Sequence, residues 1–422
     1  MRDPGEEIRR DQLDSGIRVV TDRMSGVGSV SIGCWVTIGS RDEPAELAGA
    51  SHFLEHLLFK GTADRTARMI AEEVDARGGE MNAFTAQERT AYYLRVPADA
   101  FDWAVSLLGE VVARPAFRPD ELEAERQVIL EEILMNLDAP DDRAQTLLFE
   151  GLFPGHPVGR EILGDAATVQ AMSRDWVDAF HHAHYGPANL VVAAAGAIDH
   201  DELLGAVDRW PEDDRRAESP TRSAPEALPV PLVVEERPTE QAHVCFGWRG
   251  LDHFDPDRYA LAVGNQVFGG GAASRLFQKV REERGLAYAV GSSPASFADC
   301  GALTLYAGTA PNNLDELLAV VVDVVAELAE EGVNASELEV AKGFLCGSFV
   351  LGLEDSGSRM SRIGAGEAIR REVIPIAEHL RRIEAVDLDD VRRVLHQVLS
   401  GPRTVTAVGP FGADHPALAR LS

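Results

Sequence analysis

Short runs of β-branched and aromatic residues stand early in each half of the chain and predict β-strands. Residues 30–36 and residues 244–248 have this composition. Two further runs, residues 81–85 and residues 91–96, lie close enough together to form a strand pair. The chain is therefore expected to contain β-sheet in both halves.

Apolar positions with helical spacing follow the first strands. Residues 67–77 predict an amphipathic helix, and residues 120–137 predict a long one. Pro119 precedes the long helix, and acidic residues occupy its first turn, where the helix dipole favours negative charge. This mixture predicts an α+β fold in which each half is a mixed β-sheet packed with helices.

Three pairs of similar segments recur at nearly the same separation along the chain. The separation is 215 residues for one pair, 216 for another and close to these for the third. The pairs are residues 186–191 and 401–406, residues 121–123 and 337–339, and residues 173–177 and 388–391. Three matches at one separation predict two homologous domains that arose by internal duplication.

A proline-rich polar segment divides the chain near its middle. Residues 210–231 carry five prolines and no apolar period, which is typical of a linker between domains. The expected domains are therefore residues 1–209 and residues 232–422. A length of 422 residues suits two domains of roughly 200 residues each.

Composition narrows the range of partners. The chain has 69 acidic and 40 basic side chains, a formal net charge of −29, which argues against nucleic acid or an anionic membrane as a partner. The four cysteines form no CxxC pair, so neither a thiolate metal site nor a redox motif is expected. No apolar run approaches the length of a membrane span, and the first residues lack the apolar core of a signal peptide. We expect a cytoplasmic protein.

An HxxEH motif is the strongest chemical signal in the sequence. His52 and His56 are four residues apart, so on a helix both imidazoles project from one face, as two ligands of one metal ion must. Glu55 lies on the same face, where it can reach a water beside the metal and act as a general base. This is the inverted form of the commoner zinc-peptidase motif.

A catalytic zinc ion usually has a third protein ligand, and the long helix offers candidates. Glu125 and Glu132 are seven residues apart and share one face of that helix, whereas residues 128–130 are expected on its packed side. Glu131 is expected to be a solvated surface residue.

These motifs resemble the pitrilysin family of zinc metallopeptidases, which includes the mitochondrial processing peptidase. Residues 49–62 are similar to the family signature, and Glu132 stands 76 positions after His56, where the family has its distal ligand. The resemblance implies one zinc ion per chain, held by His52, His56 and Glu132. It also implies that Glu55 is the catalytic base and that Glu125 supports the site by orienting a ligand.

The segment 78–85 resembles the family's substrate-binding edge strand. The resemblance implies that Asn82, Ala83 and Phe84 hold an extended peptide through main-chain hydrogen bonds, which tolerates many substrate sequences. An ordinary hairpin strand is the alternative interpretation of these residues.

The second half lacks the metal ligands but keeps another family feature. At a separation of 216, Ala341 and Ser348 stand opposite Glu125 and Glu132, and no HxxEH occurs near residues 259–266. Arg281 and Tyr288 resemble the family's Arg/Tyr pair, which implies substrate binding and stabilisation of the oxyanion.

The resemblance implies a zinc-dependent endopeptidase that acts on extended or unfolded peptides. Larger family members join two duplicated pairs of domains, so a chain with one pair is expected to form a homodimer, in which Arg281 and Tyr288 serve the partner's zinc site. A heterodimer with a related subunit is the alternative. Two other functions stay open: a non-catalytic scaffold subunit of a larger assembly, and a processing peptidase dedicated to one precursor.

Overall fold

The computed structural model describes residues 5–210, 217 and 219–421, and these residues form two compact units. Each unit is assembled from three separate segments of the chain. Unit 1 takes the described residues of Met1–Ile133, Glu161–Thr221 and Val350–Ala377. Unit 2 takes those of Leu134–Arg160, Arg222–Phe349 and Glu378–Ser422.

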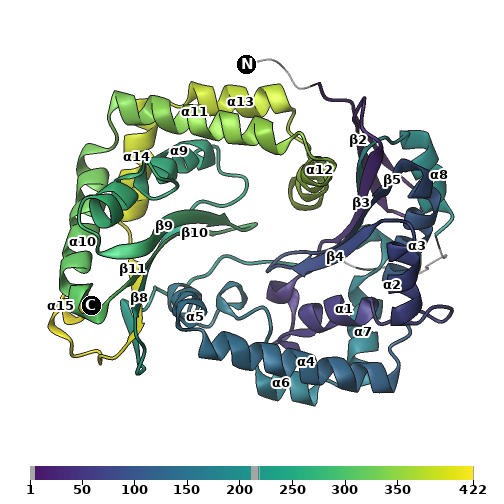
Figure 1. Cartoon of the computed structure of the whole chain (residues 1–422), viewed down its shortest axis with the longest axis horizontal. Coiled ribbons are helices and arrows are strands. Elements are labelled where there is room, and N and C mark those ends of the chain that lie inside the picture. The colour runs from purple at the N-terminus through teal and green to yellow at the C-terminus, as the bar shows by residue number, and fades with distance from the viewer. Residues whose placement is uncertain (1–4, 211–216, 218, 422) are drawn as a thin grey trace. The chain divides into compact units, whose positions relative to one another are not determined.

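Unit 1 is built on a six-stranded mixed sheet with the strand order β1-β2-β6-β3-β5-β4 (Figure 1). The β2–β6 pair is parallel and the other pairs are antiparallel. β4 pairs only with β5, so it forms one edge of this sheet. The strands are β1 (Ile8–Gln12), β2 (Arg18–Arg23), β3 (Ser29–Val36), β4 (Glu80–Thr85), β5 (Thr90–Pro97) and β6 (Leu190–Gly196).

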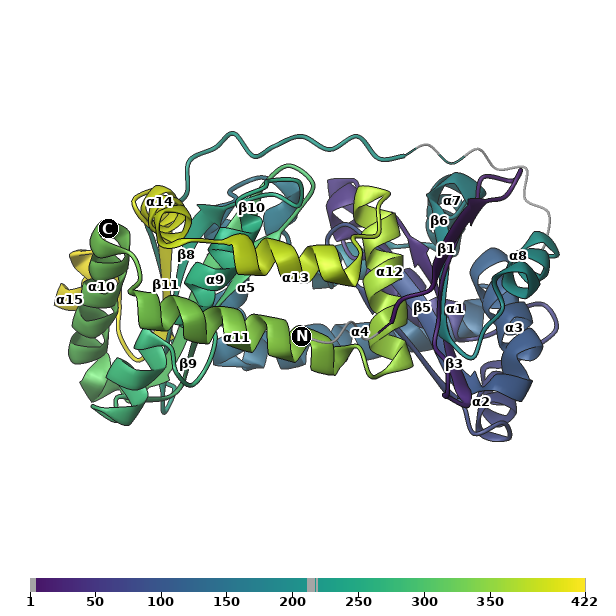
Figure 2. The same cartoon turned by 90° about the horizontal axis from the view of Figure 1, so that it is seen from above.

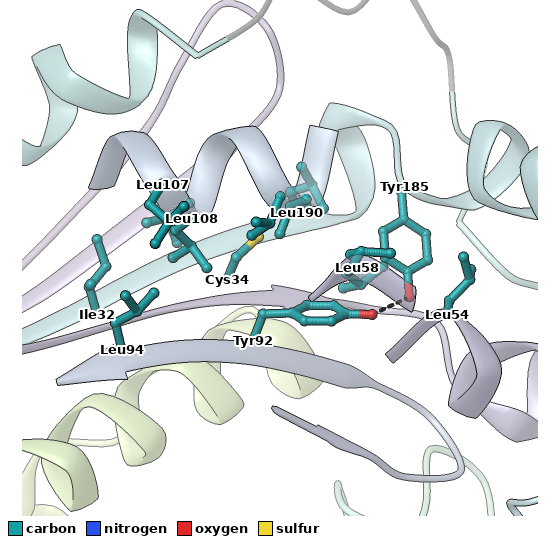
Figure 3. Packing of buried hydrophobic residues seen from close by; sticks show 14 of the residues in the cluster. Ile32, Cys34, Leu54, Leu58, Tyr92, Leu94, Leu107, Leu108, Tyr185 and Leu190 are labelled. Carbon is teal, nitrogen blue, oxygen red and sulfur yellow. Dashed lines mark hydrogen bonds between the residues drawn. The ribbon is translucent and has the colours of Figure 1, made fainter. Parts of the chain in front are cut away.

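One face of the unit 1 sheet packs against most of that unit's helices and encloses its main core. Figure 3 shows Ile32 and Leu94 of the sheet beside Leu107 of α3, which covers this face. The Tyr92 and Tyr185 hydroxyls form a buried hydrogen bond of 3.0 Å, drawn there as a dashed line. The helices are α1 (Ala50–Leu58), α2 (Ala67–Asp75), α3 (Phe101–Ala113), α4 (Pro119–Asp138), α6 (Ala166–Ala171), α7 (Arg174–His184) and α8 (His200–Asp208). The core on this face fixes α1, which carries the HxxEH motif.

The opposite face of the unit 1 sheet is covered by α12 (Ser356–Arg370), a helix from the second half of the chain. Figures 1 and 2 show α12 beside the strands of this sheet. Trp35 of β3 packs where α12 has Gly364, and a Cβ at Gly364 would lie 2.6 Å from the indole ring. The helix is also held by a buried ion pair between Arg359 and Asp22, 3.2 Å apart.

Unit 2 repeats this plan with a five-stranded mixed sheet in the order β7-β11-β8-β10-β9. Its strands are β7 (Leu232–Glu236), β8 (Ala242–Gly250), β9 (Ala287–Ser296), β10 (Gly301–Thr309) and β11 (Arg403–Gly409). One face carries the core, and the other packs against α5 (Pro140–Leu152), a helix from the first half. The remaining helices are α9 (Arg258–Phe268), α10 (Leu314–Glu331), α11 (Ala335–Gly352), α13 (Ile376–Ala385), α14 (Leu388–Leu399) and α15 (Pro416–Ala419).

The repeated plan confirms the predicted α+β fold with two homologous domains. The helix pairs α4 and α11, and α5 and α12, both begin 216 residues apart, the separation found in the sequence. The compact units are nevertheless interleaved, because α5 and α12 each leave the contiguous half that encodes them. The compact units therefore differ from the predicted domains 1–209 and 232–422. As the boundaries of the duplicated sequence segments, these two ranges stay a prediction.

The predicted linker 210–231 lies partly outside the described residues, at 211–216 and 218. Its described residues form no helix or strand. The predicted strands match β3, β4, β5 and β8, and the predicted helices match α2 and α4. The other strands of the described residues were not predicted, namely β1, β2, β6, β7, β9, β10 and β11. Among the described residues, no helix is long and apolar enough to cross a membrane.

Candidate metal and catalytic site

The helix that carries the HxxEH motif begins at a glycine that no other residue could replace without strain. Gly49 has φ +94°, and a Cβ there would lie 2.5 Å from the Leu163 carbonyl oxygen. The buried Glu43 carboxylate accepts hydrogen bonds from the amides of Gly49 and Ser51, at 2.8 and 2.6 Å. It thereby satisfies the free N–H groups of the first turn. The start of α1 is therefore fixed by the backbone conformation of Gly49 and by the buried carboxylate of Glu43.

The packed face of α1 directs the two histidines toward α4. Phe53 and Leu57 are buried in the core, and the His52 and His56 rings lie side by side with their centroids 4.7 Å apart. Burial and, to a smaller extent, the neighbouring His56 lower the pKa of His52 to about 4. His52 is therefore neutral at pH 7, the form that binds metal ions.

His52, His56 and Glu132 meet at one point of unit 1. The Nε2 atoms of both histidines lie 3.7 Å from Oε2 of Glu132. One ligand atom from each of the three residues lies within 4.8 Å of the others, and the described part of the chain holds no other such group. Two imidazole nitrogens and a carboxylate oxygen are a donor set that suits a catalytic zinc ion. The residues present thus fit the metal that the sequence predicts.

Glu125 and Lys60 lie behind His56. Oε2 of the buried Glu125 is 3.0 Å from Nδ1 of His56, and its other oxygen is 2.7 Å from Nζ of Lys60. The Glu125 carboxylate accepts this hydrogen bond, so Nδ1 of His56 carries the proton. Nε2 of His56 then presents its lone pair toward Glu132. His52 differs, because its Nδ1 is buried without a hydrogen-bond partner among the described residues.

Replacing Lys60 by methionine should weaken zinc binding by roughly 10–100-fold. The change leaves the buried Glu125 carboxylate without its cation, so that it no longer orients His56. Zinc affinity measured by competition with a chromophoric chelator tests this expectation. Lys60→Arg keeps the positive charge and should retain most of the affinity. Equal affinities for Lys60→Met and the unaltered chain would contradict the role of Lys60.

Glu55 is held from the end of β4. The Thr85 hydroxyl donates a hydrogen bond to Oε2 of Glu55 at 2.6 Å. Burial raises the pKa of the Glu55 carboxyl, whereas the Thr85 bond and His56 oppose this rise. A carboxylate with a raised pKa is better suited to take up and then release a proton near neutral pH.

The predicted substrate-binding residues Asn82, Ala83 and Phe84 lie on β4. The outer side of this strand is the sheet edge, which has no partner strand in the described part of the chain. An edge strand presents free N–H and C=O groups that can pair with an added strand. The place of β4 at the sheet edge is compatible with peptide binding by Asn82, Ala83 and Phe84. Their role in binding stays a prediction.

Arg281 and Tyr288 lie together in unit 2. The Arg281 guanidinium stands 4.2 Å from the Tyr288 ring centroid and donates a hydrogen bond of 3.0 Å to the Tyr288 carbonyl oxygen. The Tyr288 side chain is 80% exposed. The structure thus brings these two residues together, and their part in substrate binding stays a prediction.

One expectation about α4 was wrong. Val128 was expected on the packed side, but it is 49% exposed, whereas Ile129 is buried. The reason is helical geometry, because Val128 lies four residues after Ala124 and three before Glu131, and both of these positions are exposed. Ile129 instead lies on the stripe of the buried Leu122 and Ile133. Glu131 is exposed as expected. Lys60, Thr85 and Glu43 were not singled out from the sequence, although Lys60 and Thr85 fall within the quoted segments 49–62 and 78–85.

Comparison with known proteins places these residues in a family. A family model described as Insulinase (Peptidase family M16) matches residues 18–166. A second model, the peptidase M16 inactive domain, matches residues 171–345. An uncharacterized zinc protease of Mycobacterium tuberculosis is 43% identical over 96% of this chain and 94% of its own length. This chain belongs to peptidase family M16. The resemblance to pitrilysin-type peptidases is thereby confirmed.

One more curated protein and two solved structures are similar to this chain. An uncharacterized zinc protease of Bacillus subtilis is 36% identical, with 96% of this chain and 99% of that protein covered. A crystal structure from Pseudomonas fluorescens, named for the M16 inactive domain, has a TM-score of 0.90 at 23% identity, covering 97% of this chain and all of that one. A protease from Helicobacter pylori has a TM-score of 0.89 at 21% identity, with 96% and 99% covered. At these identities the two structures show a shared fold.

Proposed function

We propose that this M16 protein is a zinc-dependent endopeptidase that hydrolyses peptide bonds in extended or unfolded peptides. The observation that supports the proposal best is the convergence of His52, His56 and Glu132, with Glu55 held beside them by Thr85. A bound zinc ion supplies Lewis acidity, which polarises both water and the substrate carbonyl. The scaffold alternative gives no reason for such a ligand set.

In this mechanism Glu55 is the proton carrier. Its carboxylate takes a proton from the water that attacks the carbonyl carbon, and then gives this proton to the nitrogen of the departing amine. Thr85 keeps the carboxylate in one orientation through both transfers. Glu125 acts through His56, as a positioning residue. An extended substrate pairs with the main chain of Asn82, Ala83 and Phe84.

The second unit contributes Arg281 and Tyr288 in this proposal. A guanidinium and a phenol can both donate hydrogen bonds to an oxygen that gains negative charge. We propose a homodimer in which this pair serves the partner's zinc site. A heterodimer with a related subunit satisfies the same chemistry.

Zinc removal tests the proposed function. A chelator followed by dialysis should abolish cleavage of a quenched unstructured peptide, and one equivalent of zinc per chain should restore it. Metal content is measured in parallel by plasma emission spectroscopy. Glu132→Gln should lose zinc and activity together, whereas the matched change Glu131→Gln, at the exposed neighbouring position, should lose neither.

Two results would overturn the proposal. Cleavage that persists after the metal is shown to be absent would exclude a zinc-dependent reaction. A chain that holds one zinc ion yet cleaves no unstructured peptide would favour the scaffold subunit instead. Sequencing of the cleavage sites in a proteome-derived peptide mixture separates a general endopeptidase from one dedicated to a single precursor.

A further inference from the structure

A cavity of unit 1 lies between the sheet and the start of α12, on the face of β4 opposite to α1. Its volume is about 580 Å³. Phe84 of β4, Tyr93 of β5 and Met360 of α12 give it an apolar wall. At its rim, Arg95 and Asp355 form an ion pair of 3.1 Å. A concave, mainly apolar space of this size with a few polar groups is typical of a binding site.

The side chains of β4 alternate between the metal site and this cavity. Thr85 points to the α1 face, where it holds Glu55, and Met81 and Ala83 pack against the core on that face. Phe84 packs against the cluster on the α12 face. A peptide added along the edge of β4 would continue the same alternation, because successive residues of a strand face opposite sides of the sheet. Every second substrate side chain would then point to the α12 face.

We propose that the cavity beside α12 is a specificity subsite that binds large apolar side chains at alternate positions of the substrate peptide. This inference rests on the proposed function. It assigns a role in substrate selection to α12, a helix that the second half of the chain contributes to unit 1.

The Arg95 and Asp355 charges at the rim compensate each other, so the apolar wall is expected to decide the choice of side chain unless Glu80 attracts a cation. Asp355 pairs with Arg95 through Oδ1 and accepts the Ser358 amide through Oδ2 at 2.9 Å, capping α12. Glu80, at the end of β4, is exposed, and no described residue forms an ion pair with it. Among substrate side chains, leucine, methionine and phenylalanine would bury the most apolar surface against this wall. We expect this burial to raise kcat/KM at least about tenfold over a peptide with alanine at the same position.

Filling the cavity tests the proposal. Ser361 lines it from α12 and is exposed, so Ser361→Trp can occupy the space without disturbing the buried core. The control Ser336→Trp lies at an exposed position of α11. Cleavage sites are sequenced from a peptide library for each protein. We expect large apolar residues to be enriched at positions two residues apart, and Ser361→Trp should remove this enrichment while leaving the intermediate positions unchanged.

Peptide binding provides a readout that does not require turnover. Two labelled peptides, one with phenylalanine and one with alanine at the selected positions, are titrated against Glu55→Gln by fluorescence anisotropy. The phenylalanine peptide should bind about tenfold more tightly, and adding Ser361→Trp should abolish this difference. If no peptide is cleaved but the difference depends on Ser361, the proposed function fails and the subsite stands.

Two outcomes would overturn the subsite. The first is an apolar preference that Ser361→Trp leaves unaltered in a protein that cleaves peptides. The second is a preference for lysine or arginine at the alternate positions that Glu80→Gln removes, because the occupant would then be a cation at Glu80. Glu46→Gln, at another exposed site of unit 1, is the matched control for that charge.

Discussion

Replacing Glu55 by glutamine should lower kcat for peptide hydrolysis by about 10²–10⁴-fold while one zinc ion per chain is retained. The amide has nearly the shape of the carboxylate, and its oxygen can still accept the hydrogen bond from Thr85. It cannot take a proton from water, so the loss falls on the chemical step. Single-turnover cleavage of a quenched peptide, together with metal analysis, measures both quantities.

The control for this variant is Glu131→Gln, which removes an exposed carboxylate next to Glu132 and should leave kcat unchanged within a factor of two or so. A Glu55→Gln protein that binds zinc fully and cleaves as fast as the unaltered chain would show that Glu55 is not the base. A loss of zinc in Glu55→Gln would instead place this carboxylate among the metal ligands.

The metal ligands could be predicted because two of them depend on local geometry. His52 and His56 are one turn apart, so any helix through these residues puts both imidazoles on one face. The same argument places Glu125 and Glu132 together on α4. Nothing in the spacing brings α1 to α4, and that step depended on the resemblance to the M16 family.

The groups behind the ligands could not be predicted in the same way. Lys60 reaches Glu125, which is 65 positions away in the sequence, and Thr85 reaches Glu55, which is 30 positions away. Each contact is made by packing between elements, which periodicity along one element does not report. The burial of Val128 was predicted wrongly because its apolar character suggested a packed position, whereas the residue lies on the exposed side of α4.

The sequence also could not predict that α5 packs on the sheet of unit 2 and α12 on the sheet of unit 1. The 216-residue separation of their first residues shows in the structure that the two helices are equivalent, but the sequence does not show which sheet each one covers. The structure places α12 over the sheet of unit 1, where Asp22 of β2 is fully buried and paired with Arg359. The two charges of this pair indicate where α12 packs only once it is known that Asp22 and Arg359 contact each other.

Replacing Arg359 by leucine should destabilise unit 1 by about 3–5 kcal/mol, because it leaves the buried Asp22 carboxylate without its cation. Arg362, whose guanidinium lies 3.7 Å from Asp22, compensates only in part. Loss of hydrogen-exchange protection in α12 and β2 measures the effect on this unit directly. Arg68→Leu removes an arginine from an exposed pair with Glu72 on α2 and should change stability by less than about 0.5 kcal/mol.

The effect of Arg359→Leu should depend on pH in a defined direction. Burial raises the pKa of Asp22 in the folded chain, and removal of the guanidinium raises it further. Between the unfolded pKa, about 3.9, and the raised folded value, the folded chain binds more protons than the unfolded one. The variant should therefore lose stability relative to the unaltered chain as pH rises through this window. The double variant Asp22→Asn with Arg359→Leu, which buries no charge at this pair, should recover most of the loss at pH 7. A deficit that is the same at pH 4 and pH 7, and that the double variant does not reduce, would show that Arg359 holds α12 through its hydrogen bonds to the Leu353 and Gly5 carbonyl oxygens instead.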